Sequence, residues 1–420
     1  MNPLQETILR KNAIRLLPIL TLAYLVNYLD RTNISFAALT MNKDVGLTAT
    51  QYGRGAGIFF LAYCLFEVPS NLALYRFGAR LWIARIMITW GLVSIGTVFV
   101  VGPWSFYIMR LLLGLAEAGF FAGVAFYLAA WFPAHYRARI LAGFLVAIPF
   151  STVVGAPLSG LLLKLDGTFG LAGWKWLLIV EGLPAVVLGV VVAYLLADRP
   201  ATAGWLDPQE KAALAEMLAA EPRERVREGM LETFRDPRVI VCALVQFGFT
   251  IGSYGILFWL PQVLKAGGLT DLTVSLLTAI PYAFATAAMI GWALLVDKSG
   301  KKIGNLTITC GLGAVGLVIS VLTDQVAIGL VGLTIALIGI TSARAVFWTI
   351  PTRFLTGVGA ASGLALINSI GVMGGYFGPE LMGVLKDATG GYFAGLLTMA
   401  GILAVSTLLA ASLKLLIKLE

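Results

Sequence analysis

Two side chains of opposite charge stand next to each other in the first long apolar stretch of the chain. Asp30 and Arg31 lie within residues 13–38, a segment otherwise apolar enough to cross a lipid bilayer. A charge at the centre of a spanning helix costs roughly 2.5–3.5 kcal/mol on insertion scales, so intramembrane charges mark candidate functional sites. Arg31 could clamp a carboxylate with its paired donors, and Asp30 could carry a proton because burial favours its neutral form. The alternative is a static ion pair that holds helices together.

A second pair of charged residues occurs within residues 104–131. Arg110 and Glu117 are separated by two helical turns, so they share a face about 10 Å apart along the axis. Because that distance is too long for direct contact in a straight helix, each is expected to find its partner on another helix. Glu117 is a candidate proton carrier, and a purely structural buried carboxylate is the alternative.

Arg344 is a third intramembrane arginine, well inside residues 326–350. We hypothesise that it receives the second carboxylate of a substrate whose first carboxylate is bound by Arg31. The alternative is a pair at a cytoplasmic gate, or a side chain that reaches towards the inner surface. On the first segment, Asn27, Arg31 and Ser35 recur every four residues, which predicts a polar stripe along a cavity.

A polar stripe also runs along residues 238–262. Gln246, Thr250 and Tyr254 are spaced four residues apart and could form the second wall of such a cavity. Hydroxyl groups on apolar helices often bond only their own backbone, which is the alternative.

The composition is that of a membrane protein. The 420 residues are 59% hydrophobic and 12% charged, with a mean hydropathy of +0.89, whereas soluble domains have about 25% charged residues. The first apolar run is too long for a secretory signal. The three cysteines lie in apolar segments, and a single histidine gives no metal-ligand spacing. Nucleophile and nucleotide motifs are also missing from the sequence, so we predict neither an enzyme nor a cofactor. The expected spans are residues 13–38, 52–75, 82–102, 104–131, 139–163, 174–197, 238–262, 274–296, 305–323, 326–350, 355–384 and 392–416.

The basic residues predict the orientation of these spans. Of the 30 Lys and Arg residues, 21 fall in the loops on the side of the termini and 6 in the opposite loops. This bias places both termini in the cytoplasm by the positive-inside pattern. Because the basic residues sit in short loops at segment ends, the net charge of +8 does not indicate nucleic-acid binding.

The chain divides into two similar halves, residues 1–197 and 238–420. The glycines of two basic turns, Gly78 and Gly300, are 222 residues apart, and so are Pro157 and Pro379 in Gly-Pro-rich spans. A charged segment, residues 198–237, would be a cytoplasmic linker with a short helix near 208–220. We predict an all-α membrane protein with twelve helices in two pseudo-symmetric halves and a site between them. The alternative is chance recurrence of glycine, proline and basic turns.

At these residues the chain resembles the major facilitator superfamily and, more narrowly, its anion:cation symporter family. That family includes carriers of sugar acids, tartrate and phthalate, sialin and the vesicular glutamate transporters. The resemblance covers essentially the whole chain. It is carried by Asn27-Tyr28-Leu29-Asp30-Arg31, Glu67-Val68-Pro69-Ser70-Asn71, the stretch from Arg110 to Ala118, Trp131-Phe132-Pro133 and the stretch from Ala365 to Gly371.

The resemblance implies roles for individual residues. Arg31 would bind the substrate anion, Asp30 and Glu117 would carry protons, and Arg110 would influence Glu117. Tyr63 and Asn368 match positions of substrate contact. For Glu67 we favour a latch or packing role. The basic turns match a signature loop, which gives coupling or gating roles to Arg76, Arg80, Asp297 and Lys298.

The expected function is proton-coupled uptake of a small organic anion by alternating access in the bacterial inner membrane, by a monomer. Sugar-acid carriers of the family can present an amide in the fifth span, whereas this chain has Ile148-Pro149-Phe150-Ser151. This departure favours compact or aromatic dicarboxylates such as tartrate or phthalate. The alternatives are an organic-anion exchanger and a symporter of a monocarboxylate sugar acid.

Overall fold

The computed structural model describes residues 3–219, 235–322, 325–355 and 357–417, and these residues form helices and connecting turns without a strand. The helices of the first part are α1 (Pro3–Val45), α2 (Ala49–Phe77), α3 (Ala79–Gly96), α4 (Pro103–Glu117), α5 (Phe120–Ala129), α6 (Ala134–Leu163), α7 (Gly173–Leu195) and α8 (Pro208–Ala219). Those of the second part are α10 (Pro237–Ala266), α11 (Asp271–Ser299), α12 (Lys302–Val321), α13 (Val326–Phe347), α14 (Pro351–Phe354), α15 (Gly357–Thr389) and α16 (Phe393–Leu416).

Most of these helices are long and apolar enough to cross a membrane. Eleven such spans occur in the described residues, with α4 and α5 together forming one of them. The Gly-rich helix α15, 33 residues long, packs between α2 and α10 as a further member of the bundle. The predicted all-α membrane fold is confirmed.

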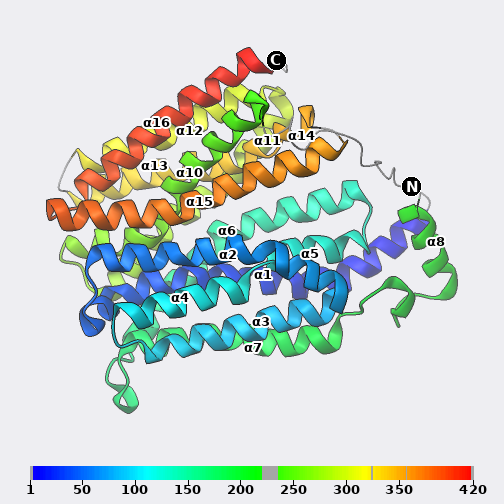
Figure 1. Cartoon of the computed structure of the whole chain (residues 1–420), viewed down its shortest axis with the longest axis horizontal. Coiled ribbons are helices and arrows are strands. Elements are labelled where there is room, and N and C mark those ends of the chain that lie inside the picture. Colours follow the sequence, from blue (N-terminus) through cyan, green and yellow to red (C-terminus); the bar gives the residue numbers. More distant parts are fainter. Residues whose placement is uncertain (1–2, 220–234, 323–324, 356, 418–420) are drawn as a thin grey trace.

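The helices form two bundles that lie side by side. In Figure 1, α1 to α7 occupy the lower part and α10 to α16 the upper part. Within the first bundle α3 packs on α7 and α2 on α4, and within the second α12 packs on α13 and α16. The bundles meet where α2 contacts α15, α6 contacts α11 and α1 contacts α10.

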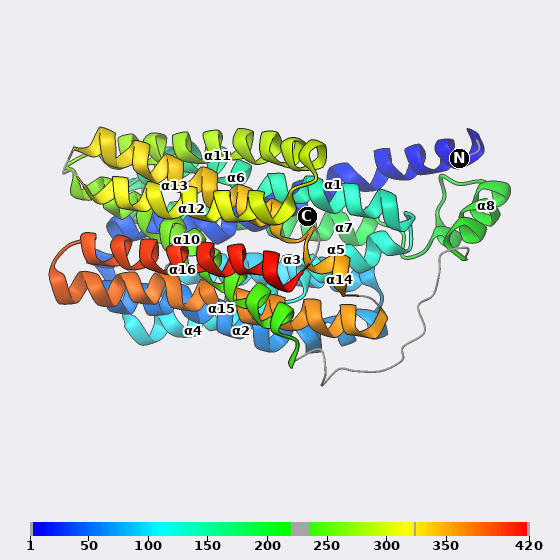
Figure 2. The same cartoon turned by 90° about the horizontal axis from the view of Figure 1, so that it is seen from above.

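The linker contributes a small helix beside the start of the chain. Figure 2 shows α8 next to the first turns of α1, away from the spanning helices. Trp205 Nε1 donates a hydrogen bond to Asn12 Oδ1 at 3.0 Å, and Lys11 Nζ lies 2.6 Å from Glu210 Oε1. Residues 220–234 of the predicted linker lie outside the described residues.

The fourth predicted span is interrupted. The sequence predicts one helix over residues 104–131, but α4 ends at Glu117 and α5 begins at Phe120. Gly119 adopts a left-handed conformation with φ +84°, and a Cβ placed on it would lie 2.6 Å from Ser70 Oγ. Glycine tolerates both conditions, so the helix breaks there. Glu117 therefore sits at a helix end, as functional residues of transporters often do.

The two bundles contact each other closely at the end remote from the termini, which lies at the left in Figure 1. Arg54 Nε lies 2.9 Å from Glu380 Oε1. Asp387 accepts hydrogen bonds from the backbone N–H groups of Ala49 at 3.2 Å and Thr50 at 2.7 Å. Backbones touch as well, since a Cβ on Gly53 would overlap the carbonyl oxygen of Pro379. We call this contact of α2 with α15 the end seam; it comprises Ala49, Thr50, Gly53, Arg54, Gly57, Tyr376, Pro379, Glu380, Gly383 and Asp387.

Candidate functional site

Arg31 forms a buried ion pair with Glu117. Arg31 Nη2 of α1 donates to Glu117 Oε1 at the end of α4, and the two side chains are only 8% and 1% exposed. The guanidinium carbon also lies 4.8 Å from the ring centroid of Tyr28, 5.1 Å from that of Phe59 and 5.4 Å from that of Tyr63. The aromatic rings exclude water from the pair, so loss of the Glu117 charge would leave a buried cation in need of an anion.

Asp30 points away from its neighbour, because consecutive helical residues are about 100° apart. Its Oδ1 accepts hydrogen bonds from Ser94 on α3 and from Asn33 Nδ2, the latter at 2.8 Å. Oδ2 has no partner in the described part of the chain, and the residue is fully buried. Asp30 thus belongs to the interior of the first bundle and forms no ion pair with Arg31 among the described residues.

Arg110 is buried without an ion pair in the described residues. It is 2% exposed, and its Nε and Nη2 lack hydrogen-bond partners there. Its guanidinium carbon lies 5.1 Å from the ring centroid of Phe59, the ring that Arg31 also contacts at 5.1 Å. The two arginines therefore share one aromatic neighbour, and a change at one alters the electrostatic surroundings of the other.

Glu181 on α7 is a further buried carboxylate that sequence reasoning missed. It is 1% exposed; its Oε1 accepts from Ser159 Oγ at 2.7 Å, and Oε2 has no partner among the described residues. A carboxylate within an apolar span was the available signal. With Asp30 and Glu117 it gives the first bundle three buried carboxylates.

A small cavity of ≈ 20 Å³ lies between the two bundles. Its lining comes from both, namely Tyr28, Thr32, Ile148, Pro149 and Thr152 from the first, and Ser253, Tyr254, Leu257, Tyr282, Leu337, Thr341 and Arg344 from the second. A cavity of this size holds about one water molecule. The two bundles are therefore closed around the site, and a substrate would require them to separate.

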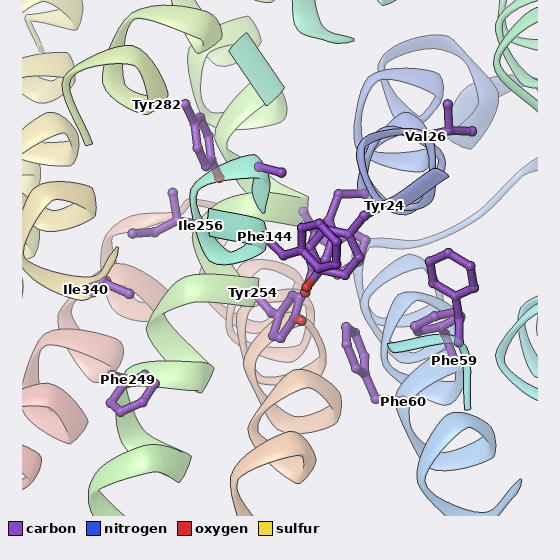
Figure 3. Packing of buried hydrophobic residues seen from close by; sticks show 14 of the residues in the cluster. Tyr24, Val26, Phe59, Phe60, Phe144, Phe249, Tyr254, Ile256, Tyr282 and Ile340 are labelled. Carbon is purple, nitrogen blue, oxygen red and sulfur yellow. The ribbon is translucent and has the colours of Figure 1, made fainter. Parts of the chain in front are cut away.

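One arginine lines this cavity and a second lies behind its wall. Arg344 lines it and donates from Nη2 to Ser253 Oγ at 2.8 Å, with its guanidinium carbon 5.9 Å from the Tyr254 ring centroid. Arg31 lies against Tyr28, which lines the other wall. Figure 3 shows Tyr254 and Tyr282 turned towards the aromatic cluster around Tyr24, whose ring stacks on Phe144 at 5.2 Å. Arg344 and Tyr254 therefore line the cavity together, whereas Arg31 is separated from it by Tyr28.

Other predicted substrate residues lie elsewhere. Gln246 packs on α15, because a Cβ placed on Gly371 would overlap its side chain. Of the predicted stripe Gln246, Thr250 and Tyr254, only Tyr254 lines the cavity. Asn368 is half-buried on α15 and does not line the cavity. Asn27 is buried with Nδ2 unpartnered among the described residues, whereas Tyr63 reaches the site only through Arg31.

The residues assigned to coupling or gating are more dispersed. Arg80 Nε lies 3.1 Å from Asp198 Oδ2, and the same carboxylate accepts from the Arg80 backbone N–H at 3.2 Å. Arg76 is exposed beside the Phe77 ring, whereas Glu67 is half-buried on α2. Asp297 and Lys298 are exposed at the end of α11. The structure therefore places these residues outside the cavity, at helix ends and on the bundle surface.

Four residues that line the cavity were not predicted as site residues, namely Tyr28, Thr152, Ser253 and Tyr282. Tyr28 stood within the charged stretch, which was a usable signal. The other three are ordinary residues for apolar helices, so the sequence alone gave no reason to choose them.

Two bundles of membrane-spanning length that hold buried charges and a cavity between them define a class of protein, the membrane transporters of organic substrates, which are not enzymes. The family model described as Major Facilitator Superfamily matches residues 20–379, and the chain belongs to that superfamily.

Relatives and solved structures agree with this assignment. A putative tartrate transporter of Agrobacterium vitis is 48% identical over 96% of this chain and 94% of its own length. A quinolone resistance transporter of Acinetobacter baumannii is 40% identical over 93% and 91% of the two chains. A bacterial homologue of the human lysosomal transporter Spinster, crystallised in an inward-facing occupied conformation, shares the fold with a TM-score of 0.77 at 16% identity, over 100% of this chain and 98% of that chain.

Proposed function

We propose that this protein is a proton-coupled symporter that takes up a small dicarboxylate of the tartrate type. The observation that carries the proposal is the buried Arg31–Glu117 pair beside a cavity whose other wall holds Arg344. The name of the Agrobacterium vitis relative supports the same substrate class.

Coupling follows from competition for one guanidinium. While Glu117 is ionised it occupies Arg31, and a substrate carboxylate would have to displace it. Protonation of Glu117 removes its charge, and Arg31 then needs another anion because an unpaired buried charge is costly. The substrate carboxylate supplies that anion. Asp30 is the second proton carrier, inside the same bundle and one residue from Arg31.

Alternating access gives the two ends of the molecule their roles. We place the basic turns and both termini in the cytoplasm of a bacterial inner membrane, following the distribution of Lys and Arg. With this orientation the end seam would close the outer side, and the small cavity would be a collapsed substrate site. Opening requires α2 to separate from α15. The transporter would work as a monomer with protons as its only coupling ion.

Charge balance limits the proton stoichiometry. The buried arginines Arg31 and Arg110 and the half-buried Arg344 equal in number the buried carboxylates Asp30, Glu117 and Glu181, so these six charges sum to zero when all are ionised. A bound dianion would add two negative charges, and protonation of Asp30 and Glu117 restores neutrality. Each further proton would be drawn inwards by about 2.3 kcal/mol per 100 mV of membrane potential.

An organic-anion exchanger is the second candidate, because an arginine in the cavity and another behind Tyr28 would also suit it. A symporter of a monocarboxylate would use Arg31 alone. Neither alternative accounts for both the Glu117 pair and Arg344 as directly as a proton-coupled dicarboxylate symporter does.

The test is uptake into proteoliposomes made acidic outside, with labelled tartrate, phthalate and a monocarboxylate sugar acid in parallel. Tartrate accumulation that a protonophore abolishes would support symport. Exchange against internal substrate without any gradient-driven accumulation would replace the symporter by an exchanger. Equal transport of the monocarboxylate would remove Arg344 from the substrate site.

A further inference from the structure

Two hydroxyl groups in the cavity have no hydrogen-bond partner. Among the cavity-lining residues, Thr152 Oγ1 and Tyr282 Oη are the buried side-chain polar atoms left without one in the described part of the chain. The residues are 2% and 5% exposed, so bulk water does not reach them in this state. Buried polar groups normally find a partner, and these two require explanation.

The free hydroxyl of Thr152 has a local cause. A helical threonine usually donates to a carbonyl three or four residues earlier. For Thr152 the carbonyl four residues back belongs to Ile148, and Ser151 Oγ already donates to it at 2.7 Å. Thr341, in the same cavity, shows the usual behaviour, with Oγ1 donating to the Leu337 carbonyl at 2.7 Å. Thr152 therefore keeps its donor for something in the cavity.

Tyr282 presents its hydroxyl from the other bundle. It lies on α11, which packs against the α6 helix that carries Thr152. Figure 3 shows the Tyr282 ring directed from its helix towards the central cluster. Thr152 and Tyr282 thus line one cavity from the two bundles. Arg344 lines the same cavity, and Arg31 lies against Tyr28, another of its lining residues.

We propose that Thr152 and Tyr282 bind hydroxyl groups on the carbon chain of a hydroxylated dicarboxylate whose carboxylates are held by Arg31 and Arg344. This inference rests on the proposed function and names the feature by which that site selects among dicarboxylates. A hydroxyl group both donates and accepts, so it satisfies a threonine and a tyrosine equally well. An unsubstituted or aromatic dicarboxylate would leave both protein hydroxyls unpaired, which penalises its binding.

The test compares tartrate, malate and succinate, which share one chain length and carry two, one and no hydroxyl groups. The measurement is kcat/KM for proton-driven uptake into proteoliposomes by the wild type and by Tyr282→Phe and Thr152→Val. The wild type should prefer tartrate over succinate, and each substitution should lower that ratio about tenfold. Uptake of succinate, which needs neither hydroxyl, reports whether each variant is folded and active.

Thr341→Val is the matched control. It removes a hydroxyl from the same cavity, but one already bonded to Leu337, so the ratio should stay at the wild-type value. Thr152→Ser, which keeps the hydroxyl, should restore the ratio lost in Thr152→Val. A variant that transports neither substrate is compared in detergent by the thermal shift that tartrate and succinate produce.

The outcomes separate this inference from the function on which it rests. A wild type that transports neither tartrate nor succinate overturns the proposed function. If the wild type transports tartrate and succinate equally, or if the variants keep the wild-type preference for tartrate, the role of the two hydroxyls is wrong. The proposed symport function is unaffected by either result. Equal losses in Thr152→Val and Thr341→Val would also overturn it.

Discussion

Replacing Glu117 by Gln should uncouple substrate binding from pH. Under the proposed mechanism each substrate molecule that binds Arg31 takes up one proton on Glu117, and this linkage changes the apparent affinity by up to tenfold per pH unit. The amide introduced by Glu117→Gln resembles the protonated acid at every pH. The variant should therefore bind tartrate with a pH dependence reduced by one proton.

The magnitude follows from the burial of the pair. Arg31 and Glu117 are 8% and 1% exposed, and breaking a buried ion pair by removing one partner costs about 3–5 kcal/mol. A substrate carboxylate that replaces Glu117 recovers much of this free energy. At alkaline pH the variant should bind tartrate on the order of 10²–10³ times more tightly than the wild type does.

Titration calorimetry across a pH series measures the affinity, and two flux assays complete the test. Glu117→Gln should retain exchange of internal for external tartrate but lose gradient-driven accumulation. Glu181→Gln is the matched control, because Glu181 is equally buried but is bonded to Ser159 rather than to an arginine. It should keep the wild-type pH dependence. If Glu117→Gln leaves the pH dependence unchanged, or if Glu181→Gln removes it as well, competition for Arg31 is not the coupling step.

Three further predictions test other parts of the molecule. Arg344→Gln should reduce dicarboxylate uptake on the order of 100-fold, because it removes the half-buried, cavity-lining charge proposed to bind the second carboxylate. Monocarboxylate uptake should fall much less, and equal losses in the two fluxes would assign Arg344 to a gate. Asp387→Ala removes two hydrogen bonds at the end seam and should raise the ratio of molecules open at that end to molecules closed there by about 5- to 30-fold. The measurement is the distance between spin labels across that end, which should lengthen. Unchanged distances would show that these bonds do not hold the closed state. The hydrogen bond from Arg238 holds the pKa of Asp236 below its ordinary value, so the stability that Asp236 contributes is present above the unfolded pKa and is lost as pH falls through the folded pKa. Asp236→Ala should therefore lower the free energy of unfolding by about 1 kcal/mol at neutral pH, and the difference from the wild type in thermal unfolding should vanish in acid. A difference that stays constant with pH would contradict a role for the carboxylate charge.

Much of the architecture could be predicted because its signals are local. Apolar length marks the spans, and charges inside them, such as Asp30, Arg31 and Arg344, stand out against that background. Helical spacing indicated that Arg110 and Glu117 share a face. These features depend on one segment at a time, which is why a single sequence carries them.

The partners across helices could not be predicted. The Arg31–Glu117 pair depends on how α1, α2 and α4 approach one another and on the break at Gly119, which no pattern within residues 104–131 indicated. Gln246 is a second residue whose contacts with a neighbouring helix could not be predicted. Its spacing with Tyr254 is correct for one face, but Gly371 on α15 leaves room that its side chain fills. Such space is created by a neighbouring helix and is invisible in the helix that uses it.

A substitution in the end seam could be used to prepare the conformation that is open at that end. Besides its ion pair and the hydrogen bonds to Asp387, the seam depends on glycines that let the two backbones approach closely. A methyl group on Gly57 would lie 2.7 Å from the carbonyl oxygen of Tyr376, too close for the two helices to keep their spacing. Gly57→Ala would act as a wedge, and a wedged protein would supply outward-open samples for cryo-microscopy or for raising antibody fragments that recognise only that form.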